Sequence, residues 1–315
     1  MRALFLAAMS AAMSAAMPTG GAARAEPPFP SSTSVESETK AYTLYEVRFP
    51  SPVKSPFEKN NTVWGHLYVP KVPFAGAAQG GKPPVVLALP IMAAPNVWIE
   101  TRFAEAFVKK GIAVLMLEMP YQFHRVPGPL IPSGQVFLAR KAKTLRFNFE
   151  QSVAVARRAV SWLEQCGMVD AERIGLFGVS LGGIVSSVVY SRDDRPKAAV
   201  LFLAGADFPD LLFQGEMTAK FVRSAGIKKD DVIAAWKGLD PLEYEERNRG
   251  KRVLLINAKS DKVIPPANAK KLKKAFPDAE QIWVFGGHYT AIVHMLWTPR
   301  YAAKRFVEYF GGDVD

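Results

Sequence analysis

The sequence predicts an α/β fold in which a mostly parallel sheet of eight strands carries helices on both faces. Six apolar runs typical of strands buried on both faces recur from residue 84 onward. Segments with helical periodicity separate most of these runs, and a helix provides the right-handed crossover that parallel neighbours need. We therefore expect one large domain over residues 42–311.

Two strand-like runs come first and flank a connection that contains Pro and Asn, which predicts an antiparallel pair at one edge of the sheet. This pair covers residues 43–49 and 62–70. The six apolar runs are residues 84–89, 112–118, 173–179, 198–204, 252–258 and 281–285. The expected helices are residues 98–110, 144–165, 181–191, 267–276 and 291–310.

Two long insertions interrupt this alternation. Residues 207–249 carry short helical patterns and predict a small helical cap. Residues 120–140, with four prolines, predict a second long loop. Both belong to the sheet end at which open α/β folds bind their ligands.

The first 25 residues predict a cleaved signal peptide. They combine a basic start at Arg2, an apolar stretch of about 15 residues and the small-residue site Ala23-Arg24-Ala25. That stretch is shorter than the roughly 20 residues that span a bilayer, so we expect an exported protein, periplasmic or extracellular, without stable membrane insertion. An uncleaved signal anchor is the alternative. Residues 26–41, rich in Pro, Ser and Glu, predict a flexible lead-in.

The composition restricts the classes of partner that we expect for this protein. The net charge is +11, and loss of Arg2 and Arg24 with the leader lowers it to +9, which favours anionic surfaces. The basic clusters at 247–252 and 270–274 have no interleaved aromatic residues, so we expect solvated faces and no nucleic-acid binding. The single cysteine, Cys166, excludes an intramolecular disulfide. Nothing in the sequence sets the oligomeric state.

A G-x-S-x-G motif from Gly178 to Gly182 lies between an apolar run and a helical pattern. This arrangement predicts a nucleophile elbow, in which a strained turn exposes Ser180 at the end of a strand. An ordinary glycine-rich turn is the alternative, and it predicts neither an acid nor a histidine at the ends of later strands. The chain has both.

Asp261 and His288 follow the last two expected strands, in the order serine, acid, histidine. A serine hydroxyl is a weak nucleophile, so His288 is expected to accept its proton and to deliver it later to the leaving group. Asp261 is expected to orient the imidazole and to stabilise its protonated form.

Other acids and histidines in the sequence are alternatives to Asp261 and His288. The competing acids are Asp207, Asp210 and Asp240, of which Asp240 precedes a proline and is typical of a turn or a helix start. His66 lies in an edge strand and His294 in the last expected helix, where packing or surface roles are expected.

An oxyanion needs two donors. Leu181, the first residue of the helix after the elbow, is expected to supply a backbone N–H. The second donor should come from the loop after residue 89, where Pro90 has no N–H but Ile91 and Met92 do.

Three further residues are candidates for substrate binding. His124 and Phe123 lie in the proline-rich loop, and Phe208 lies in the expected cap. The aromatic rings are suited to an apolar acyl pocket, whereas core packing or a structural loop role is the alternative for each.

The segment 170–183, which contains the elbow, resembles dienelactone-hydrolase-like and prolyl-oligopeptidase-like members of the α/β-hydrolase superfamily, as does the segment 261–266. The resemblance implies a nucleophile at Ser180, an acid at Asp261, a base at His288, and no metal or organic cofactor. Two features depart from the pattern: no His-Gly follows the third strand, and a serine replaces the dienelactone-type cysteine.

Together these observations predict an exported serine hydrolase that cleaves a small-molecule carboxylic ester through an acyl-enzyme on Ser180. A small acyl-peptide hydrolase or peptidase is one alternative. A non-catalytic binding protein on the same scaffold is another.

Overall fold

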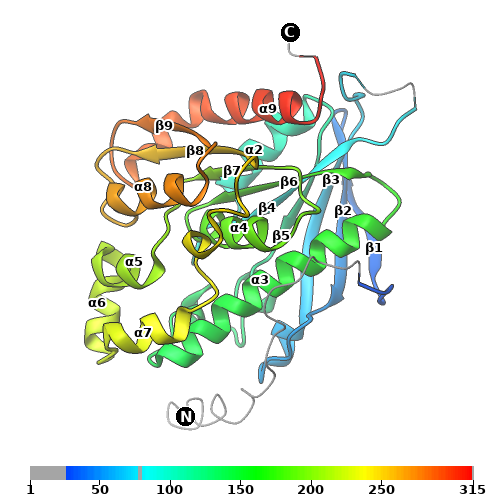
Figure 1. The fold of residues 1–315 in the computed structure, drawn as a ribbon. Helices are drawn as coiled ribbons and strands as arrows, with labels where there is room; N and C mark the ends of the chain where they lie inside the picture. The colour runs from blue at the N-terminus through cyan, green and yellow to red at the C-terminus, as the bar shows by residue number, and fades with distance from the viewer. Residues whose placement is uncertain (1–25, 77–79, 314–315) are drawn as a thin grey trace.

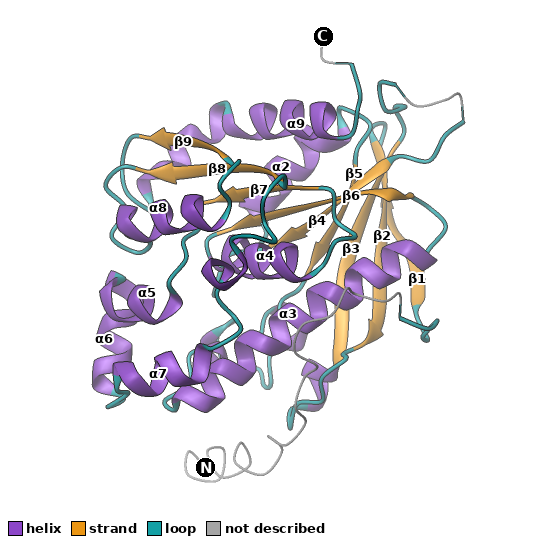
Figure 2. Ribbon diagram, in the orientation of Figure 1, coloured by secondary structure: helices purple, strands orange, loops and turns teal. Residues whose placement is uncertain are grey.

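The computed structural model describes residues 26–76 and 80–313. The expected signal peptide at residues 1–25 lies outside these ranges. The described chain forms a nine-stranded sheet in the order β1-β2-β3-β5-β4-β6-β7-β8-β9, with helices on both faces (Figures 1 and 2). The strands from β5 to β9 run parallel, and the first three are antiparallel to their neighbours.

Eight of the strands lie where the sequence predicts them. They are β2 (Tyr42–Pro50), β3 (Thr62–Pro70), β4 (Pro84–Leu89), β5 (Ala113–Leu117), β6 (Asp170–Val179), β7 (Ala198–Phe202), β8 (Arg252–Ala258) and β9 (Glu280–Val284). The prediction of a mostly parallel α/β sheet is confirmed, and the count of eight strands is one too low.

The ninth strand corrects the expected flexible lead-in. β1 (Ser32–Glu38) pairs antiparallel with β2, although every one of its residues is exposed. Its polar sequence buries no face, so it has no apolar periodicity to detect. β1 is the edge strand of the sheet, and backbone pairing with β2 defines it.

Two layers of helices cover the sheet. On one face lie α3 (Ala142–Gln165), α4 (Leu181–Arg192) and α8 (Pro266–Ala275), and on the other lie α2 (Trp98–Val108) and α9 (Thr298–Tyr309) (Figure 2). Alternate residues of β4 enter the two cores, with Leu87 in one and Val86 in the other. The strand is buried on both sides, which explains its continuous apolar run.

The expected final helix is divided in two. Where a single helix over residues 291–310 is expected, the chain forms a 3-10 helix, η6 (Thr290–Leu296), and then α9. Pro299 lies in the first turn of α9, the part of a helix that tolerates a residue without an N–H. A single continuous helix is therefore excluded.

The helical cap is present over the predicted interval 207–249. It consists of α5 (Phe208–Gln214), α6 (Glu216–Ser224), α7 (Lys229–Trp236) and the 3-10 turn η5 (Pro241–Tyr244). The cap packs on α3, where the ring of Phe149 lies 5.2 Å from Phe208 and 6.3 Å from Trp236. No helix in the described part of the chain is long and apolar enough to cross a membrane.

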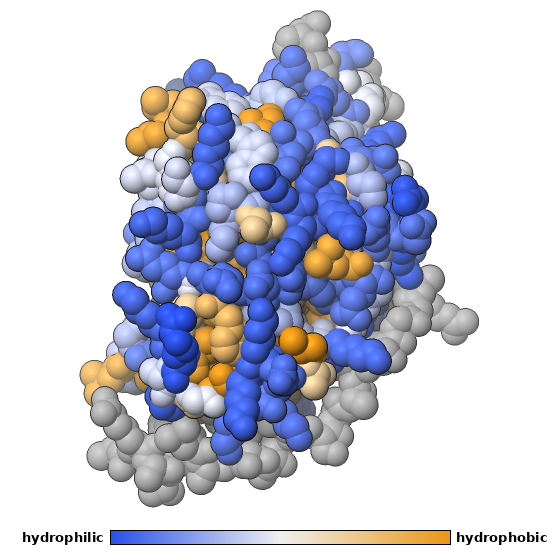
Figure 3. Space-filling view, turned by 60° about the vertical axis from the view of Figure 1, so that its left-hand side comes forward, coloured by the Kyte–Doolittle hydropathy of each residue, from blue (hydrophilic) through white to orange (hydrophobic). Residues whose placement is uncertain are grey.

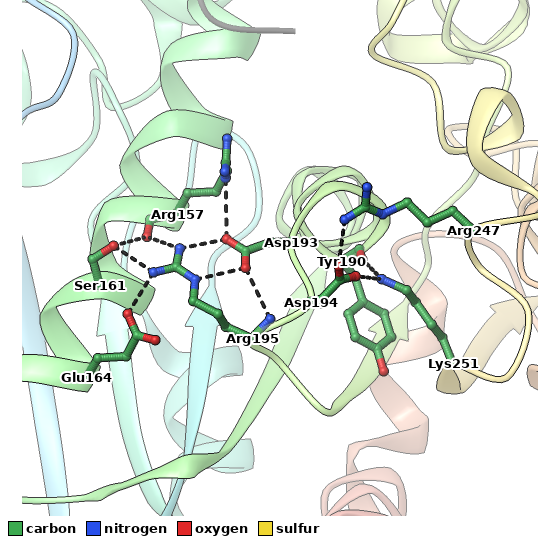
Figure 4. A network of polar contacts seen from close by, with 9 residues as sticks. All are labelled: Arg157, Ser161, Glu164, Tyr190, Asp193, Asp194, Arg195, Arg247 and Lys251. Atoms are coloured by element: carbon green, nitrogen blue, oxygen red, sulfur yellow. Dashed lines mark hydrogen bonds and ion pairs between the residues drawn. The ribbon is translucent and has the colours of Figure 1, made fainter. Parts of the chain in front are cut away.

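A buried ion-pair network anchors the far end of α4 (Figure 4). The fully buried Asp193 accepts hydrogen bonds from Arg195 at 2.6 Å and from Arg157 of α3 at 3.3 Å. Burial alone raises the pKa of Asp193, but the two guanidinium groups outweigh it and lower the pKa. The network ties α4 to α3, and Ser180 lies at the other end of α4.

Candidate active site

Ser180 lies at the sharp turn between β6 and α4, with φ 52° and ψ −117°. A non-glycine residue at positive φ is strained, as expected of a nucleophile elbow. The turn also needs its glycines. A Cβ on Gly182 would collide with the carbonyl oxygen of Leu89, and one on Gly178 would collide with the backbone of Gly182.

The structure brings the three predicted side chains together at the carboxyl ends of their strands. Nε2 of His288 lies 3.0 Å from Oγ of Ser180, and Nδ1 of His288 lies 2.8 Å from Oδ2 of Asp261. The imidazole is thus positioned to accept the hydroxyl proton on one nitrogen while the carboxylate fixes the other.

Asp261 is held rigidly. Its Oδ1 accepts the N–H groups of Val263 and Ile264, each at 2.8 Å, and its side chain is 2 % exposed. Every oxygen of the carboxylate therefore has a partner while Oδ2 is directed at the imidazole. The side chain of His288 is 10 % exposed, so the pair is shielded from solvent.

The competing acids have other roles. Asp207 caps α5 and pairs with Lys271 at 2.6 Å, and Asp210 pairs with Lys271 and Lys229. Asp240 caps η5, and burial raises its pKa. In the described chain all three direct their oxygens to these groups and not to the imidazole.

The oxyanion donors divide into two cases. Leu181 is the first residue of α4, where an N–H has no acceptor within the helix, and both Leu181 and Met92 line a pocket beside Ser180. The prediction that Ile91 is an oxyanion donor is wrong, because its N–H already donates to Oε1 of Glu100 at 3.0 Å. Glu100 is buried in α2, and burial raises the pKa of its carboxyl group.

No sequence pattern indicates that Glu100 supports this loop. Glu100 belongs to the first turn of a helix, where an acid is ordinary. Gln122 donates from Nε2 to the carbonyl oxygen of Ile91 at 2.7 Å, so the two side chains hold both polar groups of one residue. Only the tertiary structure reveals that they position the loop.

A pocket of about 80 Å³ opens beside Ser180, between the cap and the sheet. Its lining is almost wholly apolar, and it includes Phe208 as predicted. The other cap and α3 residues in the lining include Phe149, Leu211, Met217 and Trp236.

The structure does not bring Phe123 and His124 to this pocket. The ring of His124 stacks on Trp64 at 4.3 Å, and its Nδ1 lies 2.6 Å from Oε1 of the buried Glu118. These contacts hold the start of the proline-rich loop against β3 and Glu118. His124 therefore has the structural loop role that the sequence analysis gave as the alternative to substrate binding.

The two remaining histidines also have structural partners. His294 lies 3.0 Å from the carbonyl oxygen of Phe285. His66 joins Glu36 of β1, at 2.8 Å, to Glu118, at 3.5 Å. Burial opposes its charge, yet the two carboxylates raise the pKa of His66 to about 8.

In the described residues, no group of three His, Cys, Asp or Glu side chains is arranged to hold a metal ion. Burial raises the pKa of the half-buried Cys166 thiol, which disfavours the reactive thiolate.

Two family descriptions match the chain. Residues 143–307 match the prolyl oligopeptidase family, and residues 20–220 match the family "Alpha/beta hydrolase domain containing 18". Two uncharacterized proteins of Mycobacterium tuberculosis, from strains CDC 1551 and H37Rv, are 26 % identical over 180 residues. That alignment covers 56 % of this chain and only 42 % of those relatives.

Solved structures share the fold. An acetyl xylan esterase from Paenibacillus sp. R4 superimposes with a TM-score of 0.65 at 18 % identity, over 90 % of each chain. A puromycin-hydrolyzing peptidase of Mycobacterium tuberculosis gives 0.62 at 16 % identity, over 90 % of this chain and 40 % of that one. An acylaminoacyl peptidase of Pyrococcus horikoshii gives 0.60 at 15 % identity, over 87 % and 41 %.

The family matches and the fold agree. Each family match covers more than half of the chain, and the two overlap across the elbow. The chain therefore belongs to the α/β-hydrolase superfamily and, within it, to the serine hydrolases related to the prolyl oligopeptidase family.

Proposed function

We propose that this serine hydrolase cleaves carboxylic esters of small apolar acyl groups, with Ser180 as nucleophile, His288 as base and Asp261 as the orienting acid. The observation that carries the proposal is the contact of 3.0 Å between Nε2 of His288 and Oγ of Ser180, at the mouth of an apolar pocket.

The chemistry follows from this geometry. As Oγ of Ser180 attacks the ester carbonyl carbon, its proton passes to Nε2 of His288, and the carbonyl oxygen becomes an oxyanion. The N–H groups of Leu181 and Met92 would stabilise that charge. The imidazolium then protonates the departing alcohol, and a water molecule activated by the same imidazole releases the acid from the acyl-enzyme.

The pocket favours an ester over a peptide. Its lining in the described chain contains no charged side chain and few free polar groups. A peptide has amide groups on both sides of the scissile bond, and burying them without partners costs several kcal/mol. The acetyl xylan esterase also matches over 90 % of its length, whereas the two peptidases match over about 40 % of theirs.

The pocket also favours a short acyl group. An apolar cavity of about 150 Å³ accepts benzene, so a cavity of about 80 Å³ suits an acyl chain of roughly two to four carbons.

Met217 lines this pocket and is partly exposed, so shortening its side chain is a suitable way to enlarge the pocket. We expect Met217→Ala to raise kcat/KM for octanoyl esters relative to acetyl esters, measured with a nitrophenyl ester series.

The decisive experiment combines labelling with substrate profiling. A fluorophosphonate probe should label the protein, and Ser180→Ala should abolish both the label and the hydrolysis of nitrophenyl acetate. Ser186→Ala in the same helix is the matched control, because that buried hydroxyl has no partner in the described chain and its loss should leave activity unchanged. Faster turnover of aminoacyl amides than of esters would instead favour the peptidase. Absence of labelling would favour a binding protein.

We propose further that the protein is exported through its first 25 residues. Sequencing the N-terminus of protein recovered from the periplasm or the medium tests this. A start near Glu26 is expected, and an intact Met1 in the membrane fraction would contradict it.

A further inference from the structure

One short segment carries half of the large apolar side chains that are exposed in the described part of the chain. This segment, which we call the 285–297 patch, contains the turn after β9 and the helix η6. Its exposed members are Phe285, Tyr289, Ile292, Val293, Leu296 and Trp297, between 38 % and 86 % exposed. Single exposed apolar residues are normal, but a contiguous group of them marks an interaction surface.

The patch is a fixed feature of the fold. Ala291 and Met295 are buried in the core beneath it, so one side of η6 is anchored and the rest faces outward. His294 accepts a hydrogen bond from Nε1 of Trp297 at 3.3 Å while its own Nε2 contacts the carbonyl oxygen of Phe285 at 3.0 Å. The segment is therefore built to present these side chains.

Four exposed cations, Lys259, Lys262, Arg300 and Lys304, accompany the patch, and the acids nearby are already paired, Asp261 with His288 and both Glu280 and Glu308 with Arg305. No acidic residue occurs from residue 281 to residue 307. Nζ of Lys259 lies 4.6 Å from the ring of Phe285, and the loop that carries Lys259 and Lys262 bonds to the turn at Gly286. Arg300 and Lys304, one turn apart on α9, are exposed. Among the described residues none of these four cations forms an ion pair, whereas nearby Arg305 pairs with Glu280 and Glu308.

We propose that the 285–297 patch docks onto the surface of an anionic phospholipid bilayer. Aromatic and aliphatic side chains would enter the headgroup boundary, and the four cations would contact the lipid phosphates. Each Lys or Arg near such a surface adds attraction, and the net charge of +9 that remains after loss of Arg2 and Arg24 acts in the same direction. Figure 3 shows a largely hydrophilic face with apolar side chains gathered in a few patches, so apolar exposure is not general.

A second copy of the chain fits the patch less well. A two-fold contact would set the patch against itself and bring the same unpaired cations face to face. An anionic surface neutralises them.

The patch adjoins the active site. The ring of the exposed Tyr289 lies edge-on to His288, with ring centres 5.6 Å apart. Docking would thus place the entrance to Ser180 close to the lipid surface. Any effect on turnover rests on the proposed esterase function, whereas the binding itself does not.

The test uses the mature chain from Glu26 onward carrying Ser180→Ala, so that neither the apolar leader nor turnover contributes to the measured binding. We expect it to sediment with vesicles of phosphatidylcholine and phosphatidylglycerol more strongly than with phosphatidylcholine alone, and high salt should weaken the binding. Adding Val293→Ser and Leu296→Ser should lower the partition coefficient about tenfold. Adding Arg300→Glu and Lys304→Glu should remove the preference for anionic vesicles.

Matched controls lie at the opposite edge of the sheet. Val35→Ser on β1 and Lys40→Glu in the turn after it change equally exposed residues, and both should leave binding unchanged. Fluorophosphonate labelling of the patch variants with Ser180 restored shows that the site is intact. Equal binding to neutral and anionic vesicles, or full binding by Val293→Ser/Leu296→Ser, would overturn the proposal. So would a dimer in solution that these two substitutions dissociate, because the patch would then belong to a second copy.

Discussion

The carboxylate of Asp261 distributes its bonds in a way that an amide cannot reproduce. Oδ1 already accepts two backbone N–H groups, so the Nδ2 group of an Asn would face Nδ1 of His288. The imidazole would then place its proton on Nε2 and lose the lone pair that accepts the proton of Ser180.

We therefore expect Asp261→Asn to lower kcat by about 10⁴, or roughly 5 kcal/mol of barrier, with little change in thermal stability. Steady-state hydrolysis of nitrophenyl acetate and a melting curve measure the two effects. The control is Asp207→Asn, which retains a capping oxygen for α5 and should lose only a few-fold in rate. Comparable losses in the two variants would count against Asp261 as the orienting acid.

Glu100 acts on the same site through the loop after β4. Its carboxylate accepts the N–H of Ile91, the residue before the expected donor Met92. Glu100→Gln keeps an acceptor oxygen and should retain kcat within a few-fold, whereas Glu100→Leu leaves the N–H of the half-buried Ile91 without this partner. We expect Glu100→Leu to lose at least about tenfold in kcat, and a rate equal to that of Glu100→Gln would refute this role.

These residues show what the sequence can and cannot predict about the site. Ser180 and Asp261 each follow a strongly apolar strand, and His288 follows the half-buried edge strand β9, so their convergence at one sheet edge is implied by the strand pattern. The choice between Ile91 and Met92 depends on one hydrogen bond from a helix residue, which leaves no periodic signal. The position of His124 outside the pocket depends in the same way on tertiary contacts, which it makes with Trp64 and Glu118.

At the scale of elements, the elbow depends on how closely α4 approaches β4. Gly182 has no room for a side chain against the carbonyl oxygen of Leu89, and backbone cannot move as a flexible side chain does. We expect Gly182→Ala to lower the free energy of unfolding by roughly 3 kcal/mol, measured by urea denaturation. Gly128→Ala is the control, because a Cβ there meets only the end of Ile131, and it should be nearly neutral.

The elements that the sequence predicts are those whose burial imposes a pattern. β4, the second half of β6 and nearly all of β8 are apolar runs because both of their faces are covered. β1 escapes detection because it is exposed throughout, and its backbone pairing to β2 leaves no apolar period in the sequence. The division between η6 and α9 escapes because the helical period continues through a proline that starts the second helix.

At the scale of the whole molecule, two titrating groups limit stability at opposite ends of the pH range. Arg195 and Arg157 lower the pKa of Asp193, so its contribution is present above the unfolded pKa and is lost as pH falls through the lower value in the folded state. His66 has the opposite sign. Its folded pKa of about 8 lies above the usual 6.5, so its contribution is complete below about pH 6.5 and is lost as pH rises through 8.

The effect of His66 on stability is measurable because this residue of β3 contacts both Glu36 of the edge strand β1 and Glu118. A shift of this size corresponds to stabilisation on the order of 1 to 2 kcal/mol. We expect the free energy of unfolding in urea to fall by that amount between pH 6 and pH 9, and His66→Gln to remove most of the difference. The comparison with His294→Gln isolates the effect, because that residue has no carboxylate partner in the described chain. An unchanged pH dependence in His66→Gln would mean that another group controls stability at high pH.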